Sequence, residues 1–356
     1  MRRIRSVRLM IPVLLAIQPV LSNAQAYKAE RQSDHGIKVI HLVDTRAGVE
    51  VLLVPSIGNR GIELKVHGKN ILYFPQGDAA GLQKQPALSG IPFLAPWANR
   101  LDEQGFWANG KHYLLNPSLG NTRIGNNGLP IHGVLPASPL WQVKAMGADA
   151  DSAYVTSRLE FWKHPELMAQ WPFAHEYEMT YRLAQGTLQV ETTINNLGDE
   201  PMPISIGFHP YFQIPDKPRD EWTVHLPVQK MIVADDRLIP TGELRPADLP
   251  DPVPLKGRLF DTGFTDLSRD ANGLAHFVVE SGGEEIEILF GPKYPVTVVY
   301  EPPSAPDRPN PFICIEPMAA ITNALNLNHK GKYPDLPMLA PGAKWTESFW
   351  ISAKGL

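Results

Sequence analysis

Hydrophobic and polar residues alternate with a period of two along most of the chain, which is the spacing of a β-strand with one buried face. Runs of this kind are rich in Val, Ile and aromatic residues and are separated by Gly, Pro, Asn and Asp. No apolar stripe with helical spacing extends beyond a turn or two. The clearest predicted strands lie within residues 49–54, 62–66, 153–161, 176–194, 222–226, 276–290, 296–301, 312–316 and 345–353.

Turn residues inside two of these segments predict β-hairpins. Gln185–Gly186 interrupts the first, and Ser281–Gly282–Gly283 interrupts the second. Many short strands with such turns are typical of a β-sandwich or a barrel, so we predict an all-β protein. Because the sequence contains no repeat, low-complexity run or evident linker, we expect one domain over residues 27–356.

The N-terminus has the composition of an export signal. Four of the first eight residues are arginine, an apolar run covers residues 9–21, and Ala24–Gln25–Ala26 has the small-x-small form of a cleavage site. The apolar run is shorter than the roughly 20 residues that span a bilayer. We therefore expect residues 1–26 to be a removed signal peptide, and the mature protein to be periplasmic or secreted and not membrane-bound.

Charge and cysteine content narrow the function classes. The formal net charge of -4 gives no basic field to attract nucleic acid, so we expect no nucleic-acid partner. Cys314 is the single cysteine, so no intramolecular disulfide forms. Hydrophobic residues make up 43% of the sequence, which is enough for a core to stabilise the fold unaided.

The stretch SIGFHPYF places a histidine where a strand meets a turn. Strand alternation puts Ile206 and Phe208 on one face and His209 on the other. Pro210 favours extended geometry for the residue before it, which holds His209 at the strand end. A structural histidine bonded to a backbone carbonyl is the alternative for this position taken alone.

Three other stretches carry polar residues that a β-scaffold does not need. In IPFLAPWANRL, Trp97 offers a face for the C–H side of a sugar, and Asn99 and Arg100 offer polar groups for its hydroxyls. In NNGLPIHGVL, His132 precedes a glycine that permits close backbone approach. In PFICIEPM, Glu316 ends an apolar strand, which is costly unless the carboxylate is paired or functional. Structural roles remain the alternative for each stretch alone.

Taken together, these stretches resemble the aldose 1-epimerase (galactose mutarotase) family. PWANRL, IHGV, GFHPYF and IEPMAAITNALN match four family motifs in their order. VPSIGNRGIEL near the start and LAPGAKWTESFWISA at the end are also similar to the family, so the likeness covers nearly all of the mature chain.

The resemblance implies a large antiparallel β-sandwich with an open sugar-binding groove, and exchange between the α and β anomers of an aldose. It implies that Glu316 is the general base on the anomeric hydroxyl and that His209 is the general acid on the ring oxygen. It further implies that Arg100 and His132 bind the sugar. Asp261, in LFDTGFTDL, matches a sugar-binding aspartate of the family.

The residue types agree with this chemistry. Opening a hemiacetal removes one proton from O1 and delivers one to O5, which one acid and one base accomplish. At their ordinary pKa values a glutamate is ionised at neutral pH, and a neighbouring carboxylate keeps a histidine protonated. After rotation about C1–C2, the pair closes the ring with reversed roles. We therefore expect no cofactor and no metal.

Departures from the family pattern concern the substrate. Phe208 and Val134 stand where many galactose-type members have asparagine and glycine, and GFHPYF is more similar to a broader bacterial branch with diverse sugars, including the hexose-6-phosphate 1-epimerases. A phosphate site needs cations, for which Arg123, Arg158 and Lys163 are candidates. Because the protein is predicted to be exported, we expect a free sugar.

Three other classes remain as alternatives. A non-catalytic carbohydrate-binding sandwich keeps Trp97 and Arg100 but needs neither the acid nor the base. A metalloprotein using His132, His209 and Glu316 has suitable ligand types, although no closely spaced ligand pair is present. A lyase or hydrolase acting on polysaccharide is the third, because related sandwiches carry varied chemistry.

Overall fold

The computed structural model describes residues 26–302 and 311–356, and its strands are arranged in antiparallel sheets. The predicted signal segment lies outside the described residues except for Ala26, so its cleavage stays a prediction. Within the described residues, no helix is both long enough and apolar enough to cross a membrane. The prediction of an all-β antiparallel sandwich is confirmed.

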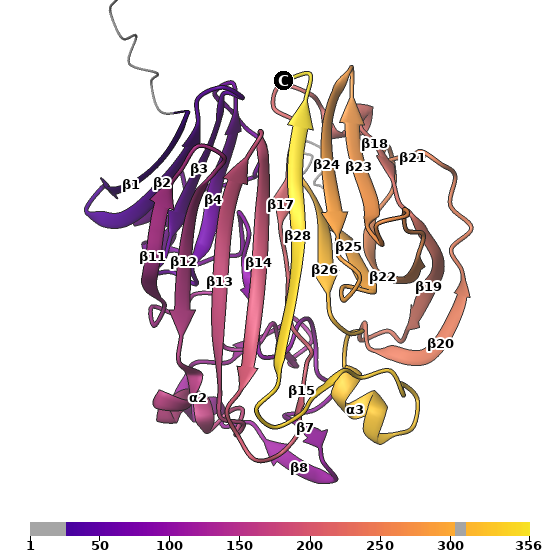
Figure 1. Ribbon diagram of the computed structural model, residues 1–356. Coiled ribbons are helices and arrows are strands. Elements are labelled where there is room, and N and C mark those ends of the chain that lie inside the picture. The colour runs from indigo at the N-terminus through magenta and orange to yellow at the C-terminus, as the bar shows by residue number, and fades with distance from the viewer. Residues whose placement is uncertain (1–25, 303–310) are drawn as a thin grey trace, which may run out of the picture.

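A nine-stranded antiparallel sheet forms one layer and faces the viewer in Figure 1. Both predicted hairpins lie in it: Gln185 and Gly186 form the first turn with positive φ, and Gly282 and Gly283 form the second. In spatial order its strands are β11 (Gln142–Ala148), β12 (Ala153–Leu159), β13 (His175–Ala184), β14 (Thr187–Asn196), β28 (Lys344–Lys354), β24 (Glu284–Phe290), β23 (Ala275–Ser281), β18 (Thr223–His225) and β21 (Val253–Pro254).

An eight-stranded antiparallel sheet forms the layer behind it (Figure 1). It carries the candidate catalytic residues, and the strands at its β16–β6 end, with β17, have only two residues each. Its strands are β20 (Pro240–Pro246), β19 (Val228–Ala234), β22 (Phe260–Leu267), β25 (Val296–Glu301), β26 (Ile313–Met318), β16 (Gly207–Phe208) and β6 (Phe93–Leu94), with β17 (Tyr211–Phe212) also paired to β26.

The N-terminal strands form a separate five-stranded meander. The described chain also has small two-stranded ladders and short helices, as the lack of a helical stripe predicts. The meander is β1 (Tyr27–Asp34), β2 (Ile37–Asp44), β3 (Val49–Val54), β4 (Arg60–Val66) and β5 (Lys69–Asn70); the ladders are β7 (Gly105–Ala108) with β8 (Lys111–Leu114), β9 (Arg123–Ile124) with β10 (Pro130–Ile131), and β15 (Met202–Pro203) with β27 (Met338–Leu339); the helices are α1 (Ala79–Lys84), α2 (Pro165–Met168) and α3 (Ala324–His329).

The two large sheets share one apolar core. Alternate residues of β13 and β14 are buried, as the period-two pattern requires. Aromatic rings cross between the layers: Phe208 of β16 lies 4.8 Å from Phe349 of β28, and Phe93 of β6 lies 5.3 Å from Tyr177 of β13, measured between ring centroids. A shared core of this kind is what a single domain over residues 27–356 requires.

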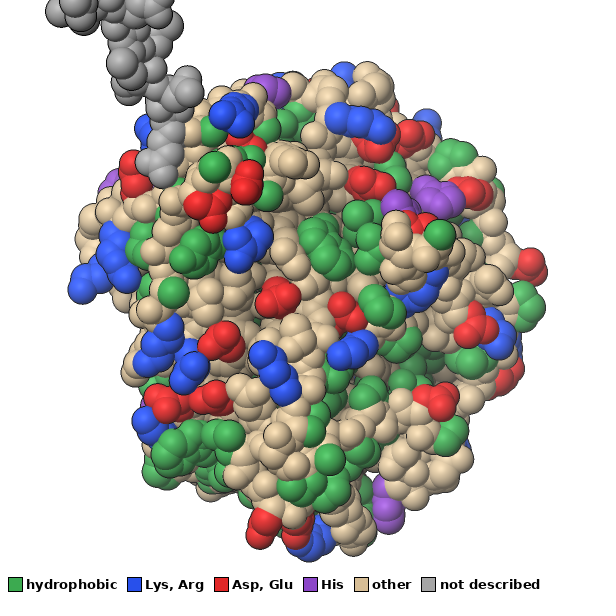
Figure 2. Space-filling view, in the orientation of Figure 1, with side chains coloured by type: hydrophobic (Ala, Val, Ile, Leu, Met, Phe, Trp, Pro, Cys, Tyr) green, Lys and Arg blue, Asp and Glu red, His purple; other side chains and the backbone are tan. Residues whose placement is uncertain are grey.

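The outer face of the nine-stranded sheet is polar and carries both charge signs. Figure 2 shows basic and acidic side chains interspersed on the face that is turned to the viewer in Figure 1. Arg158 of β12 lies 3.2 Å from Glu178 of β13, and Lys354 of β28 lies 2.9 Å from Glu285 of β24. The candidate site lies on the other large sheet.

Candidate active site

Six of the seven candidate residues from the sequence line one cavity of about 500 Å³ beside the eight-stranded sheet. This volume lies within the range of about 300–1,000 Å³ that is typical of small-molecule sites. The six residues come from segments far apart in the sequence, which only the fold brings together. They are Asn99, Arg100, His132, His209, Asp261 and Glu316.

His209 is fixed between the short strands β16 and β17. Its backbone N–H donates a hydrogen bond to the carbonyl of Pro92 at 3.0 Å. Its ring stacks on Tyr211 with centroids 4.7 Å apart and an interplanar angle of 12°, and Tyr300 meets the ring edge at 5.5 Å. The predicted strand-end position is correct, and these contacts leave the side chain almost fully buried at the cavity wall.

Glu316 lies on β26 and contacts His209 directly. The distance from Glu316 Oε1 to His209 Nε2 is 3.2 Å, and the two side chains are 1% and 6% exposed. Glu316 Oε2 and His209 Nδ1 are buried and have no hydrogen-bond partner among the described residues. A buried acceptor without a partner is costly, so this pair is arranged for a ligand and not for stability alone.

Burial is the main cause of the pKa shifts of Glu316 and His209. It raises the pKa of Glu316 well above its ordinary value, and the nearby Asp261 raises it further. Burial also lowers the pKa of His209 to about 3. Burial therefore favours the form of the pair in which Glu316 holds the shared proton and both groups are uncharged. This direction is opposite to the ionised Glu316 and protonated His209 expected from their ordinary pKa values.

Arg100 projects into the cavity from a loop that Asn99 shapes. Asn99 has a positive φ of 55°, and its Oδ1 accepts hydrogen bonds from the Arg100 backbone N–H at 2.9 Å and from Arg100 Nη1 at 3.1 Å. Arg100 Nη2 donates to Asp261 Oδ2 at 3.3 Å. The guanidinium is thus held in place at the cavity wall, and a guanidinium has further N–H groups that can donate to vicinal hydroxyls.

His132 occupies a strained position opposite this loop. Its φ is 66°, and its backbone N–H donates to the Asn99 carbonyl at 2.9 Å. Gly133 follows with a φ of 67°, and a Cβ there would lie 2.0 Å from the Ala95 carbonyl oxygen, so only glycine fits. Burial is the main cause that lowers the pKa of His132 well below its ordinary value, and any charge on the neighbouring His209 lowers it further, so the neutral ring is favoured. A neutral ring can both donate and accept.

Trp97 is the exception among the candidate residues. Its side chain is fully buried and packs against Trp171 at a centroid distance of 6.4 Å. It does not line the cavity. The prediction that Trp97 offers its face to a sugar is therefore wrong, because the tryptophan is needed to fill the core beneath the loop that carries Arg100.

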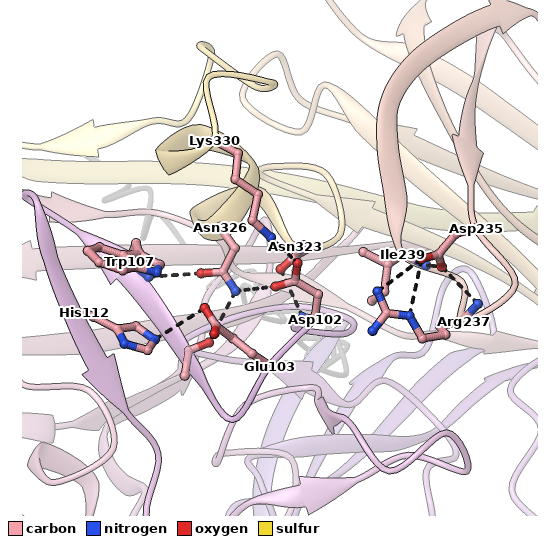
Figure 3. A network of polar contacts seen from close by, with 11 residues as sticks. Asp102, Glu103, Trp107, His112, Asp235, Arg237, Ile239, Asn323, Asn326 and Lys330 are labelled. Atoms are coloured by element: carbon pink, nitrogen blue, oxygen red, sulfur yellow. Dashed lines mark hydrogen bonds and ion pairs between the residues drawn. The ribbon is translucent and has the colours of Figure 1, made fainter.

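A polar network anchors the Arg100 loop to α3 (Figure 3). Asn326 Nδ2 donates to Asp102 Oδ1 at 2.7 Å, and Asn323 Oδ1 accepts the Asp102 backbone N–H at 3.2 Å. Lys330 forms an ion pair with the same carboxylate. The two asparagines belong to the motif IEPMAAITNALN, so that motif supplies both the candidate base and the support of the Arg100 loop.

A second ordered turn forms the opposite rim of the cavity. Asp235 Oδ1 accepts hydrogen bonds from the backbone N–H groups of Arg237 at 2.9 Å and Ile239 at 3.0 Å (Figure 3). Asn127 Nδ2 donates to the Arg237 carbonyl at 2.8 Å. Leu238 is held between them at a φ of 62°, a conformation that a leucine rarely adopts.

Two tyrosines of the site are not among the candidate residues from the sequence. Strand alternation places Tyr211 on the same face as His209, two residues earlier, but no role was assigned to it. Tyr300 faces Asp261 and Cys314 across β22, β25 and β26. Because that register depends on long-range strand pairing, no local pattern indicates it.

Only one of the three proposed phosphate-binding cations lines the cavity. Arg123 does so and forms no ion pair with another described residue. Arg158 pairs instead with Glu178 on the outer sheet face, and Lys163 pairs with Glu160 at 2.8 Å. Within residues 26–302 and 311–356, no group of three or more His, Cys, Asp or Glu side chains is arranged to hold a metal ion.

Comparison with known proteins agrees with this geometry. The family model for aldose 1-epimerase matches residues 44–352. The uncharacterised protein YphB of Escherichia coli K12 is 25% identical over 268 residues, 74% of this chain and 83% of its own length.

Solved structures show the same fold. A galactose mutarotase-like protein from Clostridium acetobutylicum superposes with a TM-score of 0.81 at 23% identity, covering 94% of this chain and all of that one. Galactose 1-epimerase from Lactobacillus acidophilus superposes with a TM-score of 0.70 at 13% identity, covering 93% of this chain and 99% of that one.

Proposed function

The chain belongs to the aldose 1-epimerase family, and from this we propose that it interconverts the α and β anomers of a free aldose by acid–base ring opening and reclosure. The observation that carries the proposal is the buried 3.2 Å contact between Glu316 and His209 at the wall of a sugar-sized cavity. O1 and O5 of a pyranose are bonded to the same carbon, so adjacent acid and base groups suit them. Faster equilibration of a fresh anomer, followed by polarimetry, tests this.

Ring opening uses the pair as one unit. Glu316 takes the proton of the anomeric hydroxyl, and His209 gives a proton to the ring oxygen. This step starts from the form with an ionised Glu316 and a protonated His209. Burial favours the opposite form, but both forms have zero net charge, so moving the proton across the 3.2 Å contact brings no net charge into the buried site.

Ring closure then runs with reversed roles. Once the C1–C2 bond has rotated, Glu316 returns its proton to O1 and His209 removes one from the C5 hydroxyl. The open-chain complex contains the uncharged form of the pair, which is the form that burial favours. The environment thus stabilises the pair in the form that accompanies the intermediate.

The buried pair also argues against the binding-module alternative. A module that only holds sugar gains nothing from an acid and a base in direct contact, with further buried polar atoms lacking partners. The hexose-6-phosphate alternative is supported by one observation, the position of Arg123 at the cavity without an ion pair to another described residue. We propose the free sugar because the other two candidate cations lie in ion pairs elsewhere.

Replacing Arg100 with alanine is expected to raise KM by about 10- to 100-fold with a small change in kcat. A hydrogen bond to a charged group contributes about 1.5–3 kcal/mol, and about 1.4 kcal/mol corresponds to tenfold in affinity. Arg158→Ala, on the outer sheet face, is the matched control and should leave both constants unchanged. Loss of kcat at constant KM would instead give Arg100 a role in the chemical step.

Activity is expected to survive removal of divalent metals, since the proposed acid and base perform both proton transfers. Dialysis against EDTA followed by polarimetry should give the same rate as dialysis against buffer alone. If EDTA abolished the activity and added zinc restored it, His132, His209 and Glu316 would instead be metal ligands.

A further inference from the structure

A second cavity of about 210 Å³ adjoins the first. The two cavities share four lining residues, so a ligand in the first can extend into the second. The shared residues are Asn99, Arg100, Leu238 and Asp261.

Strand register places this second cavity beside the candidate base. Gly263 of β22 pairs with Val298 of β25, and Val298 pairs with Glu316 of β26. Side chains of directly paired residues lie on one face with Cβ atoms about 4.5–5.5 Å apart. Gly263 and Val298 line the second cavity and Glu316 lines the first. A sugar with O1 at Glu316 therefore has C2, the neighbour of its anomeric carbon, close to the second cavity.

The floor of the second cavity is apolar. Ile232, Val296 and Val298 line it and are almost fully buried. Gly263 adds no side chain, and a Cβ at that position would lie 3.1 Å from Ile232 Cδ1. An apolar hollow beside a polar sugar site is best filled by an apolar group on the ligand, because such surface gains free energy when water leaves it.

The boundary between the cavities carries a donor and an acceptor side by side. Arg100 Nη2 donates to Asp261 Oδ2 at 3.3 Å, while Asp261 Oδ1 accepts no hydrogen bond from the described residues. An amide presents an N–H and a carbonyl in fixed relation. Asp261 can accept the N–H and Arg100 can donate to the carbonyl, since a guanidinium has five donors.

We propose that the preferred substrate is an aldose with an acylated amino group at C2, an N-acylhexosamine. The amide lies on Arg100 and Asp261, and the acyl chain enters the second cavity. This inference rests on the proposed function, because the epimerase reaction is what sets O1 at Glu316.

The volume also indicates the length of the acyl chain. At roughly 30 Å³ per non-hydrogen atom, the volume of a whole water molecule in the liquid, the three heavy atoms of an acetyl group fill about 90 Å³. The cavity of about 210 Å³ is larger. N-Butanoyl sugars should therefore be accepted as well as N-acetyl sugars.

Fresh α-N-acetylglucosamine and α-glucose differ only at C2, so their comparison tests the inference. Polarimetry is expected to give a kcat/KM about 10-fold higher for N-acetylglucosamine, from one buried methyl group and one added hydrogen bond. An equal or lower kcat/KM for N-acetylglucosamine would overturn the inference while leaving the epimerase function intact.

Ala234→Phe tests the cavity itself. Ala234 is exposed and lines only the second cavity, so phenylalanine there should block it. We expect kcat/KM for N-acetylglucosamine to fall about 10-fold and that for glucose to stay within twofold. Leu244→Phe is the control, since exposed Leu244 lines neither cavity. Equal effects of Ala234→Phe on both sugars would overturn the inference.

A binding measurement separates this inference from the proposed function. If no sugar is turned over, the proposed function fails, and saturation-transfer NMR of N-acetylglucosamine with the wild-type protein still tests the second cavity. The acetyl methyl is expected to receive the strongest saturation, and Ala234→Phe should remove that preference. Stronger saturation of the ring protons than of the methyl would contradict an acyl-binding cavity.

Discussion

Glu316→Gln is expected to lower kcat for anomer interconversion by about 10²- to 10⁴-fold, because the amide keeps the shape of the side chain but cannot take the O1 proton. Fold stability should change little. Burial already favours the uncharged form of Glu316, so a neutral amide resembles that form of the side chain. Polarimetry of a fresh aldose anomer measures the rate, and circular dichroism during urea unfolding measures the free energy of unfolding.

Glu178→Gln is the matched control, since that carboxylate lies on the outer face of the other large sheet. It should retain the wild-type kcat. If folded Glu316→Gln converted the sugar at the wild-type rate, Glu316 would not be the base. The carbohydrate-binding alternative would then become the leading account.

His209→Asn should also cost about 10²- to 10⁴-fold in kcat, because asparagine can hold a hydrogen bond but cannot deliver a proton to the ring oxygen. Some stability is expected to be lost with the ring stacking on Tyr211 and Tyr300. KM should change less than kcat, since Arg100 and Asp261 are proposed to bind the sugar.

The double variant Glu316→Gln/His209→Asn distinguishes a coupled pair from two independent groups. Residues that act as one unit are not additive, so the double variant should be hardly slower than either single variant. Multiplied losses in kcat would contradict the shared-proton mechanism, because each group would then contribute separately.

Several strands could be predicted because one face of each is buried. The predicted segments 49–54 and 296–301 coincide with β3 and β25, because alternation records which face meets the core. β1 was missed because most of Tyr27–Asp34 is exposed at a sheet edge, so burial imposes no alternation there. The polar strand β20 was missed for the same reason.

The site could be predicted only where its residues stand in recognisable local motifs. Trp97 was assigned wrongly because the sequence does not reveal whether an aromatic side chain fills the core or lines a cavity. The positions of Tyr300, Gly263 and Val298 relative to Glu316 depend on strand register, which is set by pairing between strands far apart in the sequence. The proton distribution of Glu316 and His209 depends on burial in the folded protein, which their ordinary pKa values do not include.

Exchange NMR between the α and β anomers of free aldoses tests the central claim most directly, because it observes the proposed reaction at equilibrium without a coupling enzyme. Glucose, galactose and N-acetylglucosamine are each mixed with the wild-type protein, with Glu316→Gln and with buffer alone. The account predicts exchange well above the buffer rate for at least one of these sugars with the wild-type protein, and near the buffer rate with Glu316→Gln. Exchange at the buffer rate for every sugar, although the sugar binds to the wild-type protein, would contradict it.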